Sequence, residues 1–371
     1  MKFSCEKSAL QSAAAAAARA AAVRSSVPSL EGLLIEAFSD VRISGYDLKT
    51  GICTTVRADV IEEGSVVLNA KLFGDIIRKM PDDVLTVSVD AKLNAHISCG
   101  MSEFNILGIN SSDYPEMPSA DGQTSIYIKE SVLKDMIAQT NFAVSENEAR
   151  PIHTGSLFEL EDGVLTVVSV DGYRLALRRE KVERSDIAES KFVVPGTALS
   201  EVEKLAGDSD ELIRITHGSK HINFTIGSTV LVSRRLEGEF LNYRSAVPLD
   251  GKITVGIDRR AFTDSVERVS LIINDRLKSP VRCIFADGTL KITAATALGK
   301  ASDECAIEGD GGNLEIGFNN RFLLDALRAA PSDELTVMLN SGVSPCVIVP
   351  KSGERNFIYM ILPVRLRANE G

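Results

Sequence analysis

The chain has 371 residues, of which 25% are charged and 44% are hydrophobic, and its formal net charge is −10. These proportions are ordinary for a globular protein, and the length is typical of two or three domains. Taken alone, the acidic charge argues against nucleic-acid binding, because proteins that bind DNA usually carry a basic surface.

The first third of the chain predicts two strand–helix pairs with further strands between them. Residues 2–5 alternate as in a strand, and the Ala-rich segment after them predicts a helix through residue 23. A meander of strands is expected over 33–60. The segment 66–89 then predicts a strand, a helix with apolar residues at helical spacing, an acidic turn and another strand.

Both strand–helix patterns return twice in the same order. The opening pattern returns from Ser125 and from Lys252, and the later one returns at 193–215 and at 314–337. A period of this length indicates three similar domains rather than the short units of a solenoid. The equivalent leucines, which lie 127 and then 123 residues apart, are Leu85, Leu212 and Leu335.

Two connectors that contain proline and glycine and lack periodicity separate the thirds, at 113–122 and 240–251. We therefore predict three domains. Asp162-Gly163 and Asp287-Gly288 predict hairpin turns, because glycine accepts a positive φ. The predicted domains are residues 1–122, 123–250 and 251–371.

The pattern predicts an α+β fold in which each domain consists of two β-sheet halves with one helix per half. Three such domains side by side let their sheets join edge to edge and put the six helices on one face. The two outermost strand edges would stay open, and two chains that meet head to tail would cover them. We therefore expect each chain to form a half-ring, and two chains to form a ring with helices toward the hole.

The formal charge is unevenly distributed along the sequence. The six predicted helices, of which the fifth covers 258–276, together carry +5, which leaves −15 for the rest of the chain. Such a distribution suggests that the helices form a face that is more positive than the rest of the surface. An ordinary solvated surface can also produce it.

The sequence lacks the common catalytic and cofactor motifs. It has no phosphate-binding loop, no dinucleotide-binding fingerprint and no nucleophile elbow. His217 and His221 have a metal-ligand spacing, but Gly218 indicates a turn there instead of a metal site. Six cysteines without a CxxC pair indicate reduced thiols rather than disulfides or zinc. We expect no catalytic residue, cofactor or metal.

We also expect a cytoplasmic location without membrane contact. The sequence contains no cationic segment followed by an apolar one, so no signal peptide is expected. The Ala run 13–18 is far shorter than the roughly 20 residues that a membrane span needs.

Four segments stand out beside the triple repeat: VSVDGYRLAL at 168–177, FLNYRSAVP at 240–248, LEIGFNNRFLLDAL at 314–327 and YMILPVRL at 359–366. Together with the repeat, they resemble the β subunit of bacterial DNA polymerase III, the sliding clamp, along the whole chain. The resemblance implies a non-catalytic homodimeric ring that encircles duplex DNA without sequence preference. It also implies that the ring tethers the polymerase III catalytic subunit, the clamp loader, and other polymerases and repair proteins, which gives processivity.

The resemblance implies DNA contacts through Arg24, Asn147 and Arg150. Pro151-Ile152 stands where the family often has aromatic residues, and Gly196-Thr197 stands where basic residues are common. The share of the middle domain in DNA binding is therefore open. A scaffold of the same architecture that binds partner peptides but not DNA is an alternative.

The second implied site is a hydrophobic groove between the middle and last domains that takes a short peptide from each partner. Aliphatic walls would hold leucine- or phenylalanine-type anchors, with an arginine at the rim. Val170, Tyr173, Leu241 and His153 differ from residues common in the family, so the preferred peptide is open. The residues that map onto the groove are Val170, Gly172, Tyr173, Arg174, Leu175, Leu241, Ala246, Val343, Leu362, Pro363, Val364, Arg365 and Leu366.

Ordinary structural roles compete with these assignments. Arg24 follows an Ala-rich helix, where a cation commonly interacts with the helix C-terminus. Arg174 also fits a surface strand, and 363–366 fits a frayed end. An enzyme whose active site is spread over the domain junctions is a further alternative.

Overall fold

The computed structural model describes residues 1–120, 122, 124–273 and 279–366. Positions 274–276 of the expected helix 258–276 lie outside these residues. No helix in the described ranges is long and apolar enough to cross a membrane. The chain forms two compact units, which we call the N-terminal unit (1–134, 182–187 and 197–235) and the C-terminal unit (135–181, 188–196 and the chain from 236 onward).

The N-terminal unit contains two antiparallel sheets. The five-stranded sheet has the order β5 (Asp59–Glu62), β1 (Lys2–Glu6), β7 (Val84–Val89), β8 (Asn94–Cys99), β9 (Ser102–Leu107). The nine-stranded sheet has the order β14 (Arg184–Ser185), β10 (Ser125–Lys129), β16 (Leu212–His217), β17 (His221–Ile226), β18 (Thr229–Arg234), β4 (Thr50–Val56), β3 (Val41–Tyr46), β2 (Gly32–Ala37), β6 (Gly64–Asn69).

The C-terminal unit contains one twelve-stranded sheet. Its order is β15 (Ser190–Pro195), β11 (Gly155–Glu161), β12 (Val164–Val170), β13 (Arg174–Lys181), β26 (Phe357–Ile361), β25 (Cys346–Pro350), β24 (Glu334–Leu339), β19 (Ile253–Asp258), β22 (Gly299–Glu308), β21 (Thr289–Thr296), β20 (Val281–Ala286), β23 (Leu314–Phe318).

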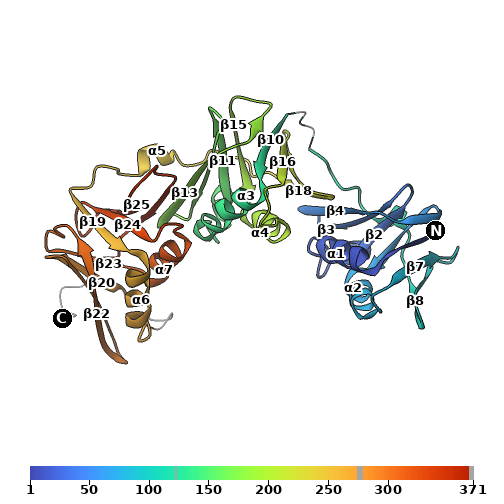
Figure 1. Ribbon diagram of the computed structural model, residues 1–371, viewed down its shortest axis with the longest axis horizontal. Coiled ribbons are helices and arrows are strands. Elements are labelled where there is room, and N and C mark those ends of the chain that lie inside the picture. Colours follow the sequence, from blue (N-terminus) through green and yellow to red (C-terminus); the bar gives the residue numbers. More distant parts are fainter. Residues whose placement is uncertain (121, 123, 274–278, 367–371) are drawn as a thin grey trace. The chain divides into compact units, whose positions relative to one another are not determined.

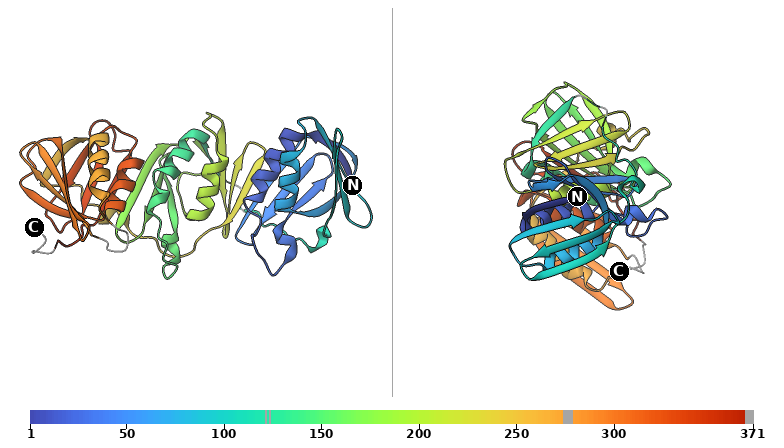
Figure 2. Two further views of the ribbon diagram at one scale, coloured as in Figure 1. Left: turned by 90° about the horizontal axis from the view of Figure 1, so that it is seen from below. Right: turned by 90° about the vertical axis from the view of Figure 1, so that its right-hand side faces the viewer.

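The helices pack against these sheets (Figure 1). In the N-terminal unit α1 and α2 lie side by side, and in the C-terminal unit α6 and α7 do the same (Figure 2). The two units divide α3 and α4 between them. The α-helices are α1 (Lys7–Ala18), α2 (Ala70–Lys79), α3 (Glu130–Ala138), α4 (Gly196–Leu205), α5 (Tyr243–Ala246), α6 (Arg259–Ser270) and α7 (Asn320–Ala329). Short 3₁₀ helices cover Pro28–Glu31, Ser111–Asp113, Asn141–Ala143 and Pro151–Thr154.

The predicted threefold repeat is visible in the strand pairing. β1, β10 and β19 each lead into a helix and each pair antiparallel with the strand that follows the acidic turn: β7, β16 and β24. In all three copies the first helical residue donates its backbone N–H to that turn. The donor and acceptor pairs are Lys7 N to Asp83 O at 3.2 Å, Glu130 N to Glu211 O at 2.8 Å and Arg259 N to Asp333 O at 2.7 Å.

The expected equivalence of Leu212 with Leu85 and Leu335 is wrong by one position. The residue in the matching register is Ile213, which pairs with Ile128 as Leu85 pairs with Cys5. Ile213 is fully buried, whereas Leu212 is 45% exposed. Successive strand residues point to opposite faces, so a shift of one position exchanges a core residue for a surface residue.

The first helix is shorter than the sequence indicates, because α1 ends at Ala18 instead of residue 23. The backbone N–H of Ala20 bonds to Ala17 O, which tightens the last turn. The N–H of Ala22 then bonds to Leu30 O at 2.9 Å, outside the helix. Tertiary hydrogen bonds therefore override the high helix propensity of alanine here.

The sheets join edge to edge across the predicted domains, as expected. β4 of the first third pairs with β18 of the second, and β13 of the second pairs with β26 of the third. The predicted hairpin turns are also confirmed, because Gly163 and Gly288 both have positive φ between paired strands. The observations confirm the α+β fold; the domain junctions near 122 and 250 stay predictions.

Candidate functional site

The loop between β12 and β13 is held by a single carboxylate. Asp171 Oδ1 accepts the backbone N–H groups of Tyr173 at 2.8 Å and of Arg174 at 3.0 Å. Gly172 has φ +92°, a conformation that favours glycine, and a side chain there would point into open space. The loop therefore presents Gly172 and Tyr173 outward from a fixed base.

Arg174 is buried, so the alternative that it is an ordinary surface strand residue is wrong. Its side chain is 8% exposed. The Nε donates to Asp171 Oδ2 at 2.9 Å, one terminal nitrogen donates to Asp325 Oδ2 at 2.6 Å and the other to the Phe142 carbonyl at 2.6 Å. The guanidinium also lies 4.4 Å from the ring centre of Phe322. Arg174 thus connects the loop to α7.

The tail after β26 is fixed beside this loop. The N–H of Leu362 donates to Tyr173 O at 2.8 Å, and that of Val364 donates to Gly317 O at 2.8 Å. The predicted tail residues are therefore bonded to the protein and do not form a frayed end over 362–364. Pro363 lies between the two bonded positions, and Arg365 is exposed.

An apolar cluster lies below the loop and the tail. Val170 and Leu175 are both buried in it, and Leu175 pairs with Met360 of β26. Phe240 and Tyr243 of the second connector complete it. Burial of these side chains fixes the base of the predicted groove, so Val170 and Leu175 support it rather than face solvent.

Three apolar residues of the predicted groove are exposed on the C-terminal unit. Tyr173 is 64% exposed and stacks on Phe322 with ring centres 6.2 Å apart. Leu241 is 39% exposed on the second connector, where Ala246 is half-buried at the end of α5. Val343 is 76% exposed in the β24–β25 loop. These are the apolar side chains that a ligand could cover.

The second connector is not a loose linker, because a polar network that is partly buried holds it. Tyr243 donates its hydroxyl to Glu159 of β11, and Arg244 pairs with Glu159 and Glu161. Burial, followed by the hydrogen bond to Glu159, raises the pKa of Tyr243 to about 12. Leu241 and Ala246 are thereby held beside the apolar cluster.

Sequence reasoning missed four residues of this region. Met360, Phe240 and Tyr243 are buried in the apolar cluster, and Phe322 contacts both Tyr173 and Arg174. Met360 could have been identified from the sequence, because it lies two residues before Leu362 in an apolar strand. Phe322 lies in the segment 314–327 that carries the resemblance, but the sequence did not indicate that it contacts the loop, because the two are remote in sequence.

The predicted DNA-binding residues are exposed in both units. Arg24 follows the turn after α1, and among the described residues it has no ion-pair partner. Asn147 and Arg150 lie in one turn, in which the Arg150 N–H donates to Asn147 O at 3.2 Å. Arg24 belongs to the N-terminal unit, and the other two belong to the C-terminal unit.

The positions where the sequence departs from the family form ordered structure. Pro151 and Ile152 belong to a 3₁₀ helix, and Ile152 packs against the apolar cluster. His153 stacks edge-on against Phe240, with ring centres 5.7 Å apart. Burial and then the nearby Arg150 lower the pKa of His153. Its neutral form is therefore favoured.

Two long strand edges are uncovered within the described chain. β9 has only β8 beside it, and β22 pairs with β19 only at Ile307 and Glu308. Phe104 and Leu107 of β9 are exposed, as is Leu298 beside β22. The other edge strands of the described sheets are either short or partly covered. β5 has four residues and β14 has two. Isolated β-bridges from Ile109, Leu236 and Val364 lie against β6, β15 and β23, respectively.

Sequence profiles of one family match the chain in order. The DNA polymerase III beta subunit N-terminal domain matches residues 1–118, its central domain matches 127–242 and its C-terminal domain matches 244–365.

Similar proteins carry the same description. The beta sliding clamp of Halalkalibacterium halodurans is 31% identical over 94% of this chain and 95% of its own length. That of Staphylococcus aureus is 32% identical over 94% of both chains. The crystal structure of the Bacillus subtilis DNA polymerase sliding clamp is 28% identical, with a TM-score of 0.93 over 99% of this chain and 100% of that one. The Pseudomonas aeruginosa clamp bound to griselimycin is 26% identical, with a TM-score of 0.92 and the same coverage.

Proposed function

This chain belongs to the DNA polymerase III β subunit family, the β sliding clamps, and from this premise we propose that two copies close into a ring around duplex DNA. The ring tethers the replicative polymerase, the clamp loader, and other polymerases and repair proteins to DNA in the cytoplasm. Its role is mechanical, and we assign no catalytic residue to it.

The observation that supports ring closure most directly is the pair of open strand edges. An uncovered edge offers unpaired backbone N–H and C=O groups to another strand. β9 is the last strand of the five-stranded sheet, and most of β22 has no partner on its β19 side. If β9 of one copy pairs with β22 of the next, the contact is head-to-tail, and two such contacts close a dimer.

Encirclement requires weak contact with DNA. Arg24, Asn147 and Arg150 are suited to phosphates because they are exposed, and phosphate contacts carry no base sequence. An acidic chain with few cations toward the hole slides more easily than a basic one, because each neutralised phosphate strengthens binding. The DNA therefore passes through the ring without a fixed register.

Two measurements test the ring. Light scattering should give twice the 40.0 kDa chain mass, independent of concentration over the micromolar range. After loading by a clamp loader, the protein should stay on nicked circular DNA at high salt and leave linear DNA by sliding off its ends. A monomer at all concentrations refutes the ring. Equal loss from both DNA forms instead favours a peptide-binding scaffold that does not encircle DNA.

Partner attachment is proposed at the loop 171–175, the second connector and the tail. Exposed Tyr173, Leu241 and Val343 offer apolar area to a peptide, and buried Val170 and Leu175 keep their support rigid. Apolar anchors that enter such a site provide most of the binding energy of a short peptide. We further propose that griselimycin, which is bound in the Pseudomonas aeruginosa clamp, binds this chain.

Truncation of the tail tests this site. A chain that ends at Leu362 should lose binding of a fluorescein-labelled peptide Ser-Leu-Ser-Leu-Phe while its dimer mass stays unchanged. An exchange of exposed Lys181 for Ala, at the far end of β13, serves as the matched control and should bind normally. Unchanged peptide affinity in the truncated chain rejects the assignment.

A further inference from the structure

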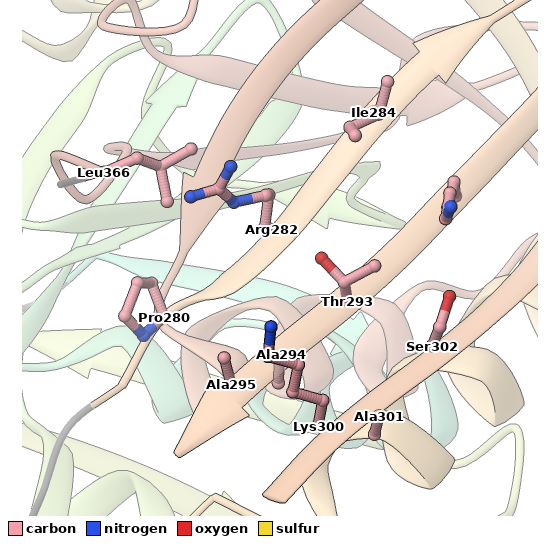
Figure 3. A pocket seen from close by; sticks show the side chains of 11 residues that line it. Pro280, Arg282, Ile284, Thr293, Ala294, Ala295, Lys300, Ala301, Ser302 and Leu366 are labelled. Atoms are coloured by element: carbon pink, nitrogen blue, oxygen red, sulfur yellow. The ribbon is translucent and has the colours of Figure 1, made fainter. Parts of the chain in front are cut away.

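The sheet face of β20–β22 that points away from the core contains a pocket of about 380 Å³. This volume is within the range of small ligand sites. Figure 3 shows side chains from the three strands together with Leu366 of the tail around it. We call it the tail pocket. Its lining residues are Pro280, Arg282, Ile284, Lys291, Thr293, Ala294, Ala295, Lys300, Ala301, Ser302 and Leu366.

The residues paired across the strands with Arg282 have small side chains or none, which makes the sheet face hollow beside it. Arg282 is paired with Gly317 on one side and Thr293 on the other, and Thr293 is paired with Ser302. A Cβ at Gly317 would lie 2.7 Å from the backbone oxygen of Val364 and 2.6 Å from Leu366 Cδ2, so glycine lets the tail lie close over β23. Leu366 thereby forms one wall of the tail pocket.

Among the described residues, those that line the tail pocket include three cations and no acidic side chain. Arg282, Lys291 and Lys300 all line it. Within the described chain Arg282 forms an ion pair with Glu315 at 2.6 Å, and Figure 3 shows its guanidinium pointing toward Leu366. Lys291 is exposed on the central strand of the three. The ligand that complements this lining carries carboxylates next to a small apolar surface.

We propose that the tail pocket binds an acidic stretch that flanks the apolar anchors of a partner peptide, a proposal that rests on the peptide-binding function above. The same tail connects the two sites. Leu362 is bonded to the loop at Tyr173, Val364 is bonded to β23, and Leu366 lines the tail pocket. Four extended residues span roughly 13 Å, so a flank of about four residues reaches from one site to the other.

The test compares three labelled peptides by fluorescence anisotropy. The first is Ser-Leu-Ser-Leu-Phe, and the other two carry four aspartates at its N-terminus or its C-terminus. In about 50 mM salt one extended peptide should bind about five-fold more tightly than the first, because its aspartates form partly exposed ion pairs with the cations of the tail pocket, and such pairs are individually weak. In about 0.5 M salt the advantage should disappear by screening.

Variants locate the effect. Lys291→Glu should abolish the gain, leave the first peptide unaffected and favour a peptide with four lysines instead. Ala295→Phe fills the tail pocket without a change of charge and should also remove the gain. Lys181→Glu, an exposed lysine of the same unit outside the tail pocket, should keep it.

The outcomes separate this proposal from the general function. If the three peptides bind the unmodified protein equally, or if Lys181→Glu removes the gain as well, the tail pocket proposal is wrong and peptide docking stands. If no peptide binds, both are wrong. If Lys291→Glu changes the dimer mass instead of the peptide preference, the face contacts a second copy, which also overturns the proposal.

Discussion

At the scale of single residues, Arg174 shows which structural features its sequence motif predicts and which become visible only in the folded protein. The DGYR segment and its resemblance located the loop correctly between two strands. They did not indicate that the guanidinium is buried, because its partners Asp325 and Phe142 lie far away in sequence. A rim arginine and a buried connecting arginine look identical in the sequence.

Arg174→Met should lower the free energy of unfolding of the C-terminal unit by about 3 kcal/mol, because it leaves Asp171 and Asp325 without their buried partner. Urea unfolding followed by circular dichroism measures the change. In a double-mutant cycle with Asp325→Asn, the two substitutions should cost at least about 1 kcal/mol less together than the sum of their separate costs.

The control for this change is Arg328→Ala, which removes the solvent-exposed ion pair with Glu267. It should cost less than about 1 kcal/mol. Equal effects of the two arginine substitutions would contradict a special structural role for Arg174.

At the scale of elements, periodicity predicted the strand–helix repeats well and their exact positions less well. The six helices exist as expected because apolar residues at helical spacing need a core to cover them. The end of α1 was missed because the bond from Ala22 to Leu30 is tertiary. The register of β16 was missed because Leu212 and Ile213 are both aliphatic, and a single sequence does not tell which one faces the core.

The corrected register gives a direct prediction. Ile213→Ala should destabilise the protein by about 3 kcal/mol, since it removes fully buried methyl groups and leaves a cavity. Leu212→Ala, the adjacent control, should change stability by less than about 1 kcal/mol because Leu212 is at the surface. Thermal or urea unfolding measures the stability of both variants. A larger loss of stability for Leu212→Ala would support the expected equivalence of Leu212 with Leu85 and Leu335.

At the scale of the whole molecule, the repeat predicted that sheets of neighbouring domains would join. The β4–β18 and β13–β26 pairs confirm it. Repetition alone did not indicate which strands stay open, since that depends on which loops and tails cover the others. The bridges of Ile109, Leu236 and Val364 supply that cover. Among the described strands, β9 and β22 keep open edges, which we propose pair with a second copy.

Leu107→Asp should therefore split the proposed dimer. Leu107 is largely exposed on the open strand β9, so the single chain tolerates a carboxylate at this position. The carboxylate becomes unfavourable only when β22 of another copy covers it and removes it from water. We expect a loss of about 2 kcal/mol, or about thirty-fold in dimer affinity. Light scattering should show the mass falling toward 40.0 kDa on dilution.

Leu249→Asp is the control, because Leu249 is exposed in the second connector and belongs to neither of the two open strands. It should keep the dimer mass, and both variants should keep the circular dichroism spectrum of the unmodified protein. Of the two variants, only Leu107→Asp should fail to stay on circular DNA, because an open ring releases its DNA. A Leu107→Asp protein that stays dimeric at nanomolar concentration would remove β9 from the interface and leave the open edge of β22 without its proposed partner.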